Sequence, residues 1–194
     1  MPPFLIQGKF PVGVRFVTYV HHRSPEMPLV VFNQKGGVGK STITCNLAAI
    51  SASQGLRTLV IDLDPQGNSS SYLRGAEASE DEPSVAGLFE HALSYTIRVV
   101  PPTSFVVPTA HERLDLMPAS PGLNELQTKL ESRQKIYKLR EAMQQLAEVY
   151  DRIYIDTPPA LNFFTRSALI GASGCLIPFD CDEFSRQALY TLLE

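Results

Sequence analysis

The chain has 194 residues, of which 44% are hydrophobic and 19% are charged, and its formal net charge is −3. These values fit one globular domain with a hydrophobic core, and they exclude the overall basic field that many nucleic-acid-binding proteins carry. The three cysteines, Cys45, Cys175 and Cys181, show no C-x-x-C spacing, which favours reduced thiols in a cytoplasmic protein. No apolar run reaches the roughly 20 residues of a membrane-spanning helix, so we expect no stable membrane insertion.

The first segment of the chain, residues 1–26, is interrupted by prolines and shows no sustained helical or alternating period. We interpret it as an irregular leader that is not part of the fold. It is either a disordered segment or a stretch that precedes the natural start at Met27. The domain is then expected to occupy residues 27–194.

A glycine-rich segment follows the short apolar run Leu29–Phe32, and residues 33–42 read N-Q-K-G-G-V-G-K-S-T. Apolar strand, glycine-rich turn and helix form the context of a phosphate-binding loop, because glycines let backbone N–H groups approach an anion. Lys40 is placed to reach the β- and γ-phosphates, and the Ser41 hydroxyl to ligate Mg²⁺. The alternative is an ordinary glycine-rich turn with two solvated lysines. We expect a helix from about Lys40 to Gln54, with an apolar stripe of Ile43, Leu47 and Ile50.

Two further strands end in acidic residues. The buried-type run Thr58–Ile61 is followed by Asp62 and Asp64 in the sequence D-L-D-P-Q-G-N, and Arg152–Ile155 is followed by Asp156. Parallel sheets place their ligands at the carboxyl ends of strands. An apolar strand that ends in Asp is the Walker B pattern, so we expect Asp156 to hold Mg²⁺ through a water molecule.

The other expected elements carry ordinary core patterns. We expect a short helix capped by Ser84, a pair of helices (or one kinked helix) that breaks near Ser132, and a last helix that begins at Phe184. Two more strands are expected at Leu114–Met117 and Gly174–Pro178.

The loop departs from the usual G-x-x-x-x-G-K-[ST] pattern, because Gln34 replaces the first glycine and Lys35 stands beside it. This arrangement resembles the deviant Walker A motif, K-G-G-x-G-K-[ST], of ParA and MinD ATPases. Together with the motifs at Asp62 and Asp156, it resembles the ParA family of partition ATPases from about Leu29 to Glu194. The resemblance implies an α/β fold: a P-loop NTPase-like, doubly wound, mostly parallel sheet with helices on both faces.

The same resemblance implies an activity and partners. ParA-like proteins bind ATP and Mg²⁺, hydrolyse ATP weakly until a ParB-like DNA-binding protein stimulates them, and form a homodimer in the ATP state. They bind DNA non-specifically, and we expect a cytoplasmic, nucleoid-associated location. Family members continue with further strands and helices, so we expect the DNA-binding surface and the contacts to the base beyond Glu194.

The family roles also carry over to individual residues. The nucleotide-binding residues are then Lys35, Gly36, Gly37, Val38, Gly39, Lys40, Ser41 and Thr42. Lys35 is expected to reach the nucleotide of the partner subunit, and Asp64 to position the attacking water. Ser41, Asp62 and Asp156 are the expected Mg²⁺ residues, with Asp62 acting through water. For Asp62 and Asp64, a purely structural role as caps of the following turn is the alternative.

Three other functions stay open. One is a MinD-like positioning ATPase at a membrane, and another is a nucleotide-binding remnant without turnover. A third is an ATP-dependent biosynthetic amidase or ligase of the cobyrinate-diamide or dethiobiotin synthetase type. Those enzymes generally lack a lysine at the position of Lys35, so this residue favours the partition ATPases.

Overall fold

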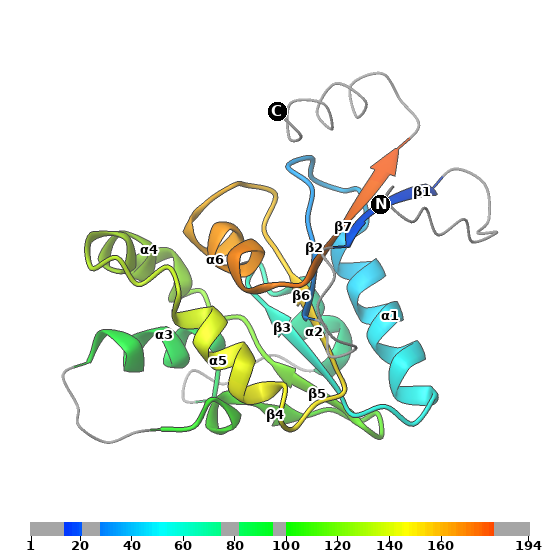
Figure 1. Cartoon of the computed structure of the whole chain (residues 1–194), viewed down its shortest axis with the longest axis horizontal. Coiled ribbons are helices and arrows are strands. Elements are labelled where there is room, and N and C mark those ends of the chain that lie inside the picture. The colour runs from blue at the N-terminus through cyan, green and yellow to red at the C-terminus, as the bar shows by residue number, and fades with distance from the viewer. Residues whose placement is uncertain (1–13, 21–27, 75–81, 95–99, 181–194) are drawn as a thin grey trace.

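The computed structural model describes residues 14–20, 28–74, 82–94 and 100–180, and the helix expected from Phe184 lies outside these ranges. Within them, seven strands form one sheet in the order β1-β7-β2-β6-β3-β5-β4 (Figure 1). The strands are β1 (Val14–Val20), β2 (Pro28–Val31), β3 (Thr58–Asp62), β4 (Val107–Pro108), β5 (Leu114–Met117), β6 (Arg152–Asp156) and β7 (Gly174–Asp180). The strands from β7 to β5 run parallel, whereas β1 and β4 pair antiparallel at the two edges.

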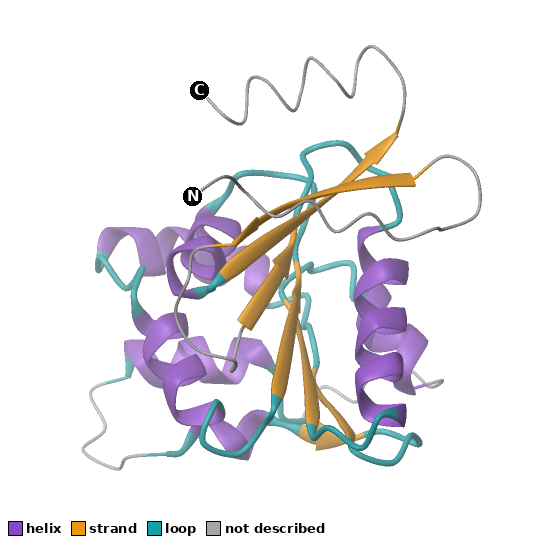
Figure 2. Cartoon of the chain, turned by 45° about the vertical axis from the view of Figure 1, so that its right-hand side comes forward, coloured by secondary structure: helices purple, strands orange, loops and turns teal. Residues whose placement is uncertain are grey.

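Helices cover both faces of this sheet (Figure 2). They are α1 (Lys40–Ser53), α2 (Asn68–Arg74), α3 (Val85–Leu93), α4 (Leu123–Ser132), α5 (Lys138–Leu146) and α6 (Phe163–Gly171), with a 3₁₀ turn at Pro102–Phe105. The first two helices lie on one face, and α3 to α6 lie on the other. This arrangement confirms the expected doubly wound α/β fold, and the break near Ser132 separates two helices. In the described residues no helix has the length and apolar character needed to cross a membrane.

The period-2 alternation of the strands divides the core into two halves. Leu59 and Ile61 pack in the cluster under α3 to α6, whereas Val60 between them packs against α1 and α2. Every residue of β3 is buried, because helices cover the sheet on both sides. The run Thr58–Ile61 therefore shows no alternation of apolar and polar residues, as expected for a central strand that is buried on both faces.

Helix α1 contacts the sheet through small side chains. Its buried residues beyond Lys40 are Thr44, Cys45, Ala48, Ser51 and Ala52. The expected apolar stripe is only partly buried: Leu47 packs against the core, Ile43 is half-buried, and Ile50 is 53% exposed. Small residues let the helix axis lie close to the sheet, and the Ser51 hydroxyl reaches the Tyr154 hydroxyl at 2.8 Å.

The strand β1 changes the interpretation of the N-terminal segment. Residues 14–20 pair with β7 from Val14↔Asp180 to Val20↔Gly174, so the expectation that residues 1–26 lie outside the fold does not hold for them. The sequence V-R-F-V-T-Y-V is rich in β-branched and aromatic residues, which fit a strand, and the prolines of the segment fall outside it. A domain start at Met27 remains a prediction.

Candidate nucleotide-binding site

The three motifs meet where the carboxyl ends of the central strands β2, β6 and β3 lie side by side. Strand β6 lies between β2 and β3, and its last residue, Asp156, is in register with Val31 on one side and with Asp62 on the other. Because these strands are parallel, the loops that leave β2, β3 and β6 all start at the same edge. The glycine-rich loop, the acidic loop and Asp156 therefore lie together, as the sequence predicts.

The glycine-rich loop leaves room for an anion above the start of α1. Gly37 and Gly39 have φ values of 75° and 83°, which favour glycine, and a Cβ on Gly36 would meet no atom within 4 Å. Gly39 is the N-cap of α1 and has no side chain with which to cap it. The first N–H groups of the helix thus have no cap from the Gly39 side chain, and the helix dipole favours an anion at this end.

Lys40 crosses this loop from the first turn of α1. Its side chain is 7% exposed, and Nζ donates to the carbonyl oxygen of Lys35 at 3.2 Å. Burial lowers the pKa of Lys40, while the charges of Asp156 and Asp64 act in the opposite direction. A cation held in this position, beside a glycine-rich loop and a helix N-terminus, fits the binding of a polyphosphate.

Asn33 holds the mouth of the loop, and our sequence interpretation gave it no role. Its Oδ1 accepts a hydrogen bond from the N–H of Lys35 at 2.9 Å, and its Nδ2 donates to the carbonyl of Pro178 at 2.8 Å. The amide thus ties the loop to β7. Lys35 is partly buried in this chain, and its expected contact with a second subunit remains a prediction.

Asp156 is buried, and two groups donate hydrogen bonds to its carboxylate. The Ser69 hydroxyl donates to Oδ2 at 2.7 Å, and the N–H of Thr157 donates to Oδ1 at 3.0 Å. Burial raises the pKa of this carboxyl group, and the hydroxyls of Ser41 and Ser69 act against the rise. A carboxylate next to the loop serine fits Mg²⁺, which proteins hold through one or two carboxylates and substrate phosphates. The described residues contain no cluster of three or more His, Cys, Asp or Glu side chains that could hold a metal.

Asp62 is fully buried and organises the acidic loop. Its Oδ1 accepts from the N–H of Asp64 at 3.1 Å, and its Oδ2 accepts from the N–H and the hydroxyl of Ser70, both at 2.8 Å. Burial, with the charge of Asp156 adding to it, raises the pKa of Asp62 to about 7. The structure thus gives Asp62 a structural role in the loop, and its expected contact with Mg²⁺ through water remains a prediction.

Asp64 lies at the turn of the same loop and is 7% exposed. Its Oδ1 accepts from the N–H of Gln66 at 3.0 Å, and its carbonyl accepts from the N–H of Gly67 at 2.8 Å. The side chain therefore caps the turn, as the alternative interpretation proposed. This contact fixes the orientation of Asp64 and leaves its role with the attacking water a prediction.

The helix α2 and its first two serines were missed. Ser69 and Ser70 are buried, and they bind the carboxylates of Asp156 and Asp62, respectively. The segment N-S-S-S-Y-L-R shows no apolar period, so only its run of hydroxyl residues directly after the acidic loop could have indicated a helix start.

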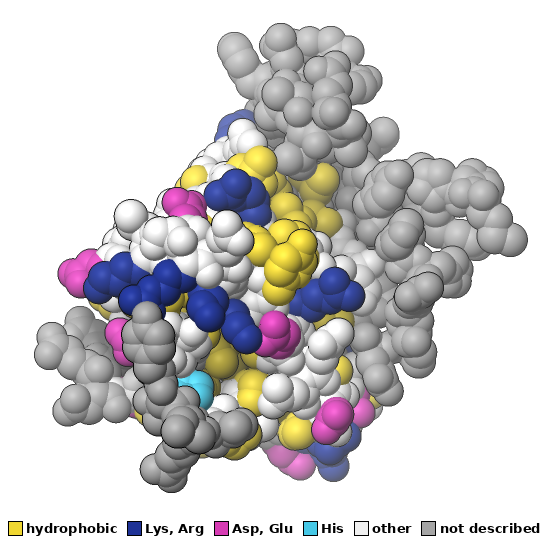
Figure 3. Space-filling model, turned by 60° about the vertical axis from the view of Figure 1, so that its left-hand side comes forward, with side chains coloured by type: hydrophobic (Ala, Val, Ile, Leu, Met, Phe, Trp, Pro, Cys, Tyr) yellow, Lys and Arg dark blue, Asp and Glu magenta, His cyan; other side chains and the backbone are white. Residues whose placement is uncertain are grey.

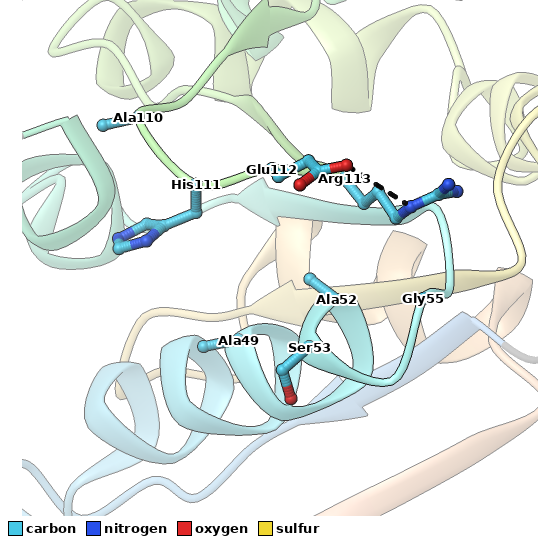
Figure 4. Close-up of a pocket in the computed structure, with 8 residues that line it drawn as sticks. All are labelled: Ala49, Ala52, Ser53, Gly55, Ala110, His111, Glu112 and Arg113. Carbon is cyan, nitrogen blue, oxygen red and sulfur yellow. Dashed lines mark ion pairs between the residues drawn. The ribbon is translucent and has the colours of Figure 1, made fainter.

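A hollow of about 450 Å³ lies at the other end of α1 (Figure 4). Ala49, Ala52, Ser53 and Gly55 line it from the helix side, and residues 110–113 line it from the loop before β5. Its Arg113 and Glu112 form an ion pair at 3.9 Å and are exposed. The hollow contains no residue of the predicted site and lies at the opposite edge of the sheet.

The face covered by α3 to α6 carries a row of Lys and Arg side chains (Figure 3). Residues 129–140 contain Lys129, Arg133, Lys135, Lys138 and Arg140 against one acidic residue, Glu131. Two ion pairs, Lys138–Glu141 and Arg166–Glu131, partly neutralise this surface. A local basic surface thus exists in a chain whose net charge is −3.

Known proteins resemble this chain in sequence and in fold. The chain is 38% identical to the chromosome partitioning protein ParA of Myxococcus xanthus over 165 residues, which cover 84% of this chain and 56% of that protein. It is 34% identical to the sporulation initiation inhibitor protein Soj of Bacillus subtilis over 166 residues, covering 85% and 62% of the two chains. The chain therefore spans less than two thirds of the length of these relatives.

Two solved structures extend the comparison. An ATP complex of McdA from Cyanothece superposes with a TM-score of 0.74 at 27% identity, over 86% of this chain and 61% of that one. Cobyrinic acid a,c-diamide synthase from Mycobacterium smegmatis, with an ATP analogue and magnesium, gives a TM-score of 0.66 at 34% identity, over 74% and 56%. A family model described as an AAA domain matches residues 28–194. The chain therefore belongs to this AAA-domain family, and its resemblance to the ParA partition ATPases is confirmed.

Proposed function

We propose that this chain is the nucleotide-binding part of a DNA-segregation ATPase that binds Mg²⁺ and ATP and acts as a nucleotide-dependent switch. The observation that carries this proposal is the meeting of the loop at residues 35–42 with Asp156 and Asp64 at one sheet edge. The relatives named as partition proteins support the segregation function, and a solved structure with an ATP analogue and magnesium supports the binding of ATP and Mg²⁺.

Each residue of the site has a defined task in this proposal. The N–H groups of the loop and the Nζ of Lys40 bind the phosphates, and the hydroxyl of Ser41 with the carboxylate of Asp156 holds the metal. Bound Mg²⁺ neutralises charge on the phosphate oxygens. Asp64, fixed by the N–H of Gln66, orients the attacking water. Hydrolysis is weak in the isolated chain and increases when a ParB-like partner binds.

The switch is a homodimer that forms in the ATP state. Lys35 reaches the nucleotide of the partner subunit and offsets the charge that develops at its γ-phosphate, as an arginine finger does. Non-specific DNA binding accompanies this state. The basic residues between positions 129 and 140, on α4, on α5 and between them, support a contribution of this chain to DNA binding.

Four measurements on the purified protein test the proposal. With Mg²⁺ and ATP, we expect a dimer by light scattering and DNA binding by fluorescence anisotropy that weakens as salt increases. Binding to anionic liposomes in place of DNA would instead indicate a membrane-associated positioning ATPase. Absence of Mg²⁺-dependent ATP binding would overturn the proposal in all its parts.

A biosynthetic amidase or ligase is the second candidate function. The structural likeness to cobyrinic acid a,c-diamide synthase, at 34% identity, supports it. An enzyme of this class would release ADP in proportion to an added carboxylate substrate. Lys35 favours the partition ATPase, because a lysine that acts across a dimer has no task in a ligase. Carboxylate-dependent ADP release without DNA binding would reverse this preference.

A further inference from the structure

The first turn of α2 meets the carboxylates of two neighbouring strands. Ser69 and Ser70 are adjacent in sequence, yet Ser69 Oγ donates to Asp156 at the end of β6, and Ser70 binds Asp62 at the end of β3. Both serines are buried, with 0% and 7% of their surfaces exposed. Neither hydroxyl therefore exchanges its carboxylate for bulk water easily, and α2 is fixed above both strand ends.

The contact between Ser69 and Asp156 has the geometry of a strong hydrogen bond. Its length of 2.7 Å is in the range of a hydroxyl that donates to a charged carboxylate. The other oxygen of Asp156 accepts from the N–H of Thr157 at 3.0 Å. These two hydrogen bonds hold the carboxylate in one orientation between α2 and the end of β6, and the Ser41 hydroxyl of α1 acts on the same group.

Ser69 is itself held in place by its surroundings. The hydroxyl of Ser70 accepts a hydrogen bond from the N–H of Ala119 at 2.9 Å, which fixes α2 to the segment after β5. The thiol of Cys45 lies 3.9 Å from the carbonyl oxygen of Ser69, so α1 packs directly against the same turn. A hydroxyl that is fixed in this way can orient another group, because it cannot follow that group when it rotates.

We propose that Ser69 is a positioning residue for the metal site, which holds Asp156 in the orientation that supports Mg²⁺ beside Ser41. This inference rests on the proposed function, because it assumes that Asp156 and Ser41 take part in Mg²⁺ binding. It also joins two parts of the site. Ser69 lies on α2, which directly follows the loop that contains Asp64. A movement of the acidic loop would therefore shift α2 and, through Ser69, the side chain of Asp156.

The test compares Ser69→Ala with Ser71→Ala, a matched control on the exposed side of the same helix. Binding of a fluorescent, non-hydrolysable ATP analogue is titrated with Mg²⁺ and repeated in EDTA. We expect Ser69→Ala to raise the Mg²⁺ concentration at half-maximal effect by about tenfold, the usual result when a group that orients a metal ligand is lost. Binding in EDTA and all values for Ser71→Ala should stay at those of the wild type.

Two further variants keep the test decisive if Ser69→Ala perturbs the fold. Ser69→Cys preserves the approximate size with a weaker donor, so its Mg²⁺ midpoint should lie between those of Ser69→Ala and the wild type. In an Asp156→Asn background, Ser69→Ala should change the midpoint much less than it does alone, because the two residues act as one unit.

The results of these titrations distinguish a failure of the role proposed for Ser69 from a failure of the proposed function. A wild-type midpoint in Ser69→Ala, or an equal loss of analogue binding in EDTA and in Mg²⁺, would overturn the positioning role. A wild-type protein that binds no analogue at any Mg²⁺ concentration would overturn the proposed function, and the inference with it.

Discussion

Asp62 and Asp156 lie opposite each other as register partners at the last positions of β3 and β6, and both are fully buried. Two carboxyl groups so close in a dry environment disfavour each other's ionisation, and the charge of Asp156 is one cause of the raised pKa of Asp62. Hydroxyl and N–H donors from α2 compensate this repulsion. Two acidic groups are thus held close together at the carboxyl ends of β3 and β6 before any ligand binds.

This pair predicts how the stability of the metal-free protein depends on pH. The pKa of Asp62 is raised from 3.8 to about 7 in the folded chain, so the folded state binds a proton more tightly than the unfolded state. The contribution of Asp62 to the free energy of unfolding is therefore full below about pH 4 and is lost as the pH rises through about 7. We expect urea unfolding in EDTA to show a smaller decrease between pH 5 and pH 7.5 in Asp62→Asn than in the wild type. Equal decreases would contradict the assignment of this titration to Asp62.

The first nucleotide prediction concerns Lys40. Lys40→Ala removes the buried cation that bridges the loop, and a charge-assisted contact of about 1.5–3 kcal/mol is lost. ATP affinity measured by calorimetry should fall by at least about tenfold. Lys129→Ala, which removes an exposed lysine of α4, is the matched control and should bind as the wild type does. Unchanged affinity in Lys40→Ala would contradict the phosphate-binding loop.

The second prediction separates the two lysines of the loop. Lys35→Ala should leave ATP binding by the monomer largely intact, because the expected target of this side chain is the nucleotide of the other subunit. The same variant should lose the ATP-dependent dimer, hydrolysis within it, or both, which analytical ultracentrifugation and phosphate release measure. If Lys35→Ala and Lys40→Ala behave alike in every assay, Lys35 acts within its own subunit.

The third prediction concerns hydrolysis. Asp64→Ala removes the group that is expected to orient water, while Asp156 and Ser41 remain. ATP and Mg²⁺ binding should persist, hydrolysis should slow, and an ATP-bound dimer should accumulate on size-exclusion chromatography. Gln66→Ala is the control, since it keeps the N–H that binds Asp64. Hydrolysis at the wild-type rate in Asp64→Ala would leave this residue with only its role in the turn.

The parts of the site that follow from local chemistry could be predicted from the sequence. Gly39 has a left-handed φ, and α1 begins at the next residue, Lys40. Only a few neighbouring residues determine this turn, so a short sequence motif is enough to predict it. Asp62 and Asp156 could be placed at one edge because each ends an apolar strand, and parallel strands align their ends.

The parts that depend on distant contacts could not be predicted. Helix α2 has no apolar period, and its serines bind Asp62 and Asp156, the latter 87 residues away in sequence. Asn33 reaches Pro178 over 145 residues. Helix α6 (Phe163–Gly171) was also missed, because it is short and its buried Phe163 and Phe164 are consecutive, which fits a strand as well as a helix.

The position of β2 in the sheet has a consequence for the order in which the protein becomes functional during its synthesis. The strand that carries the glycine-rich loop emerges early from the ribosome, but both of its neighbours, β6 and β7, are made near the end of the described chain. Such non-local pairing must await the later strands. A nascent chain that has not yet exposed β7 thus carries the complete loop sequence while β2 still lacks a neighbouring strand and Asn33 lacks its partner, the carbonyl of Pro178.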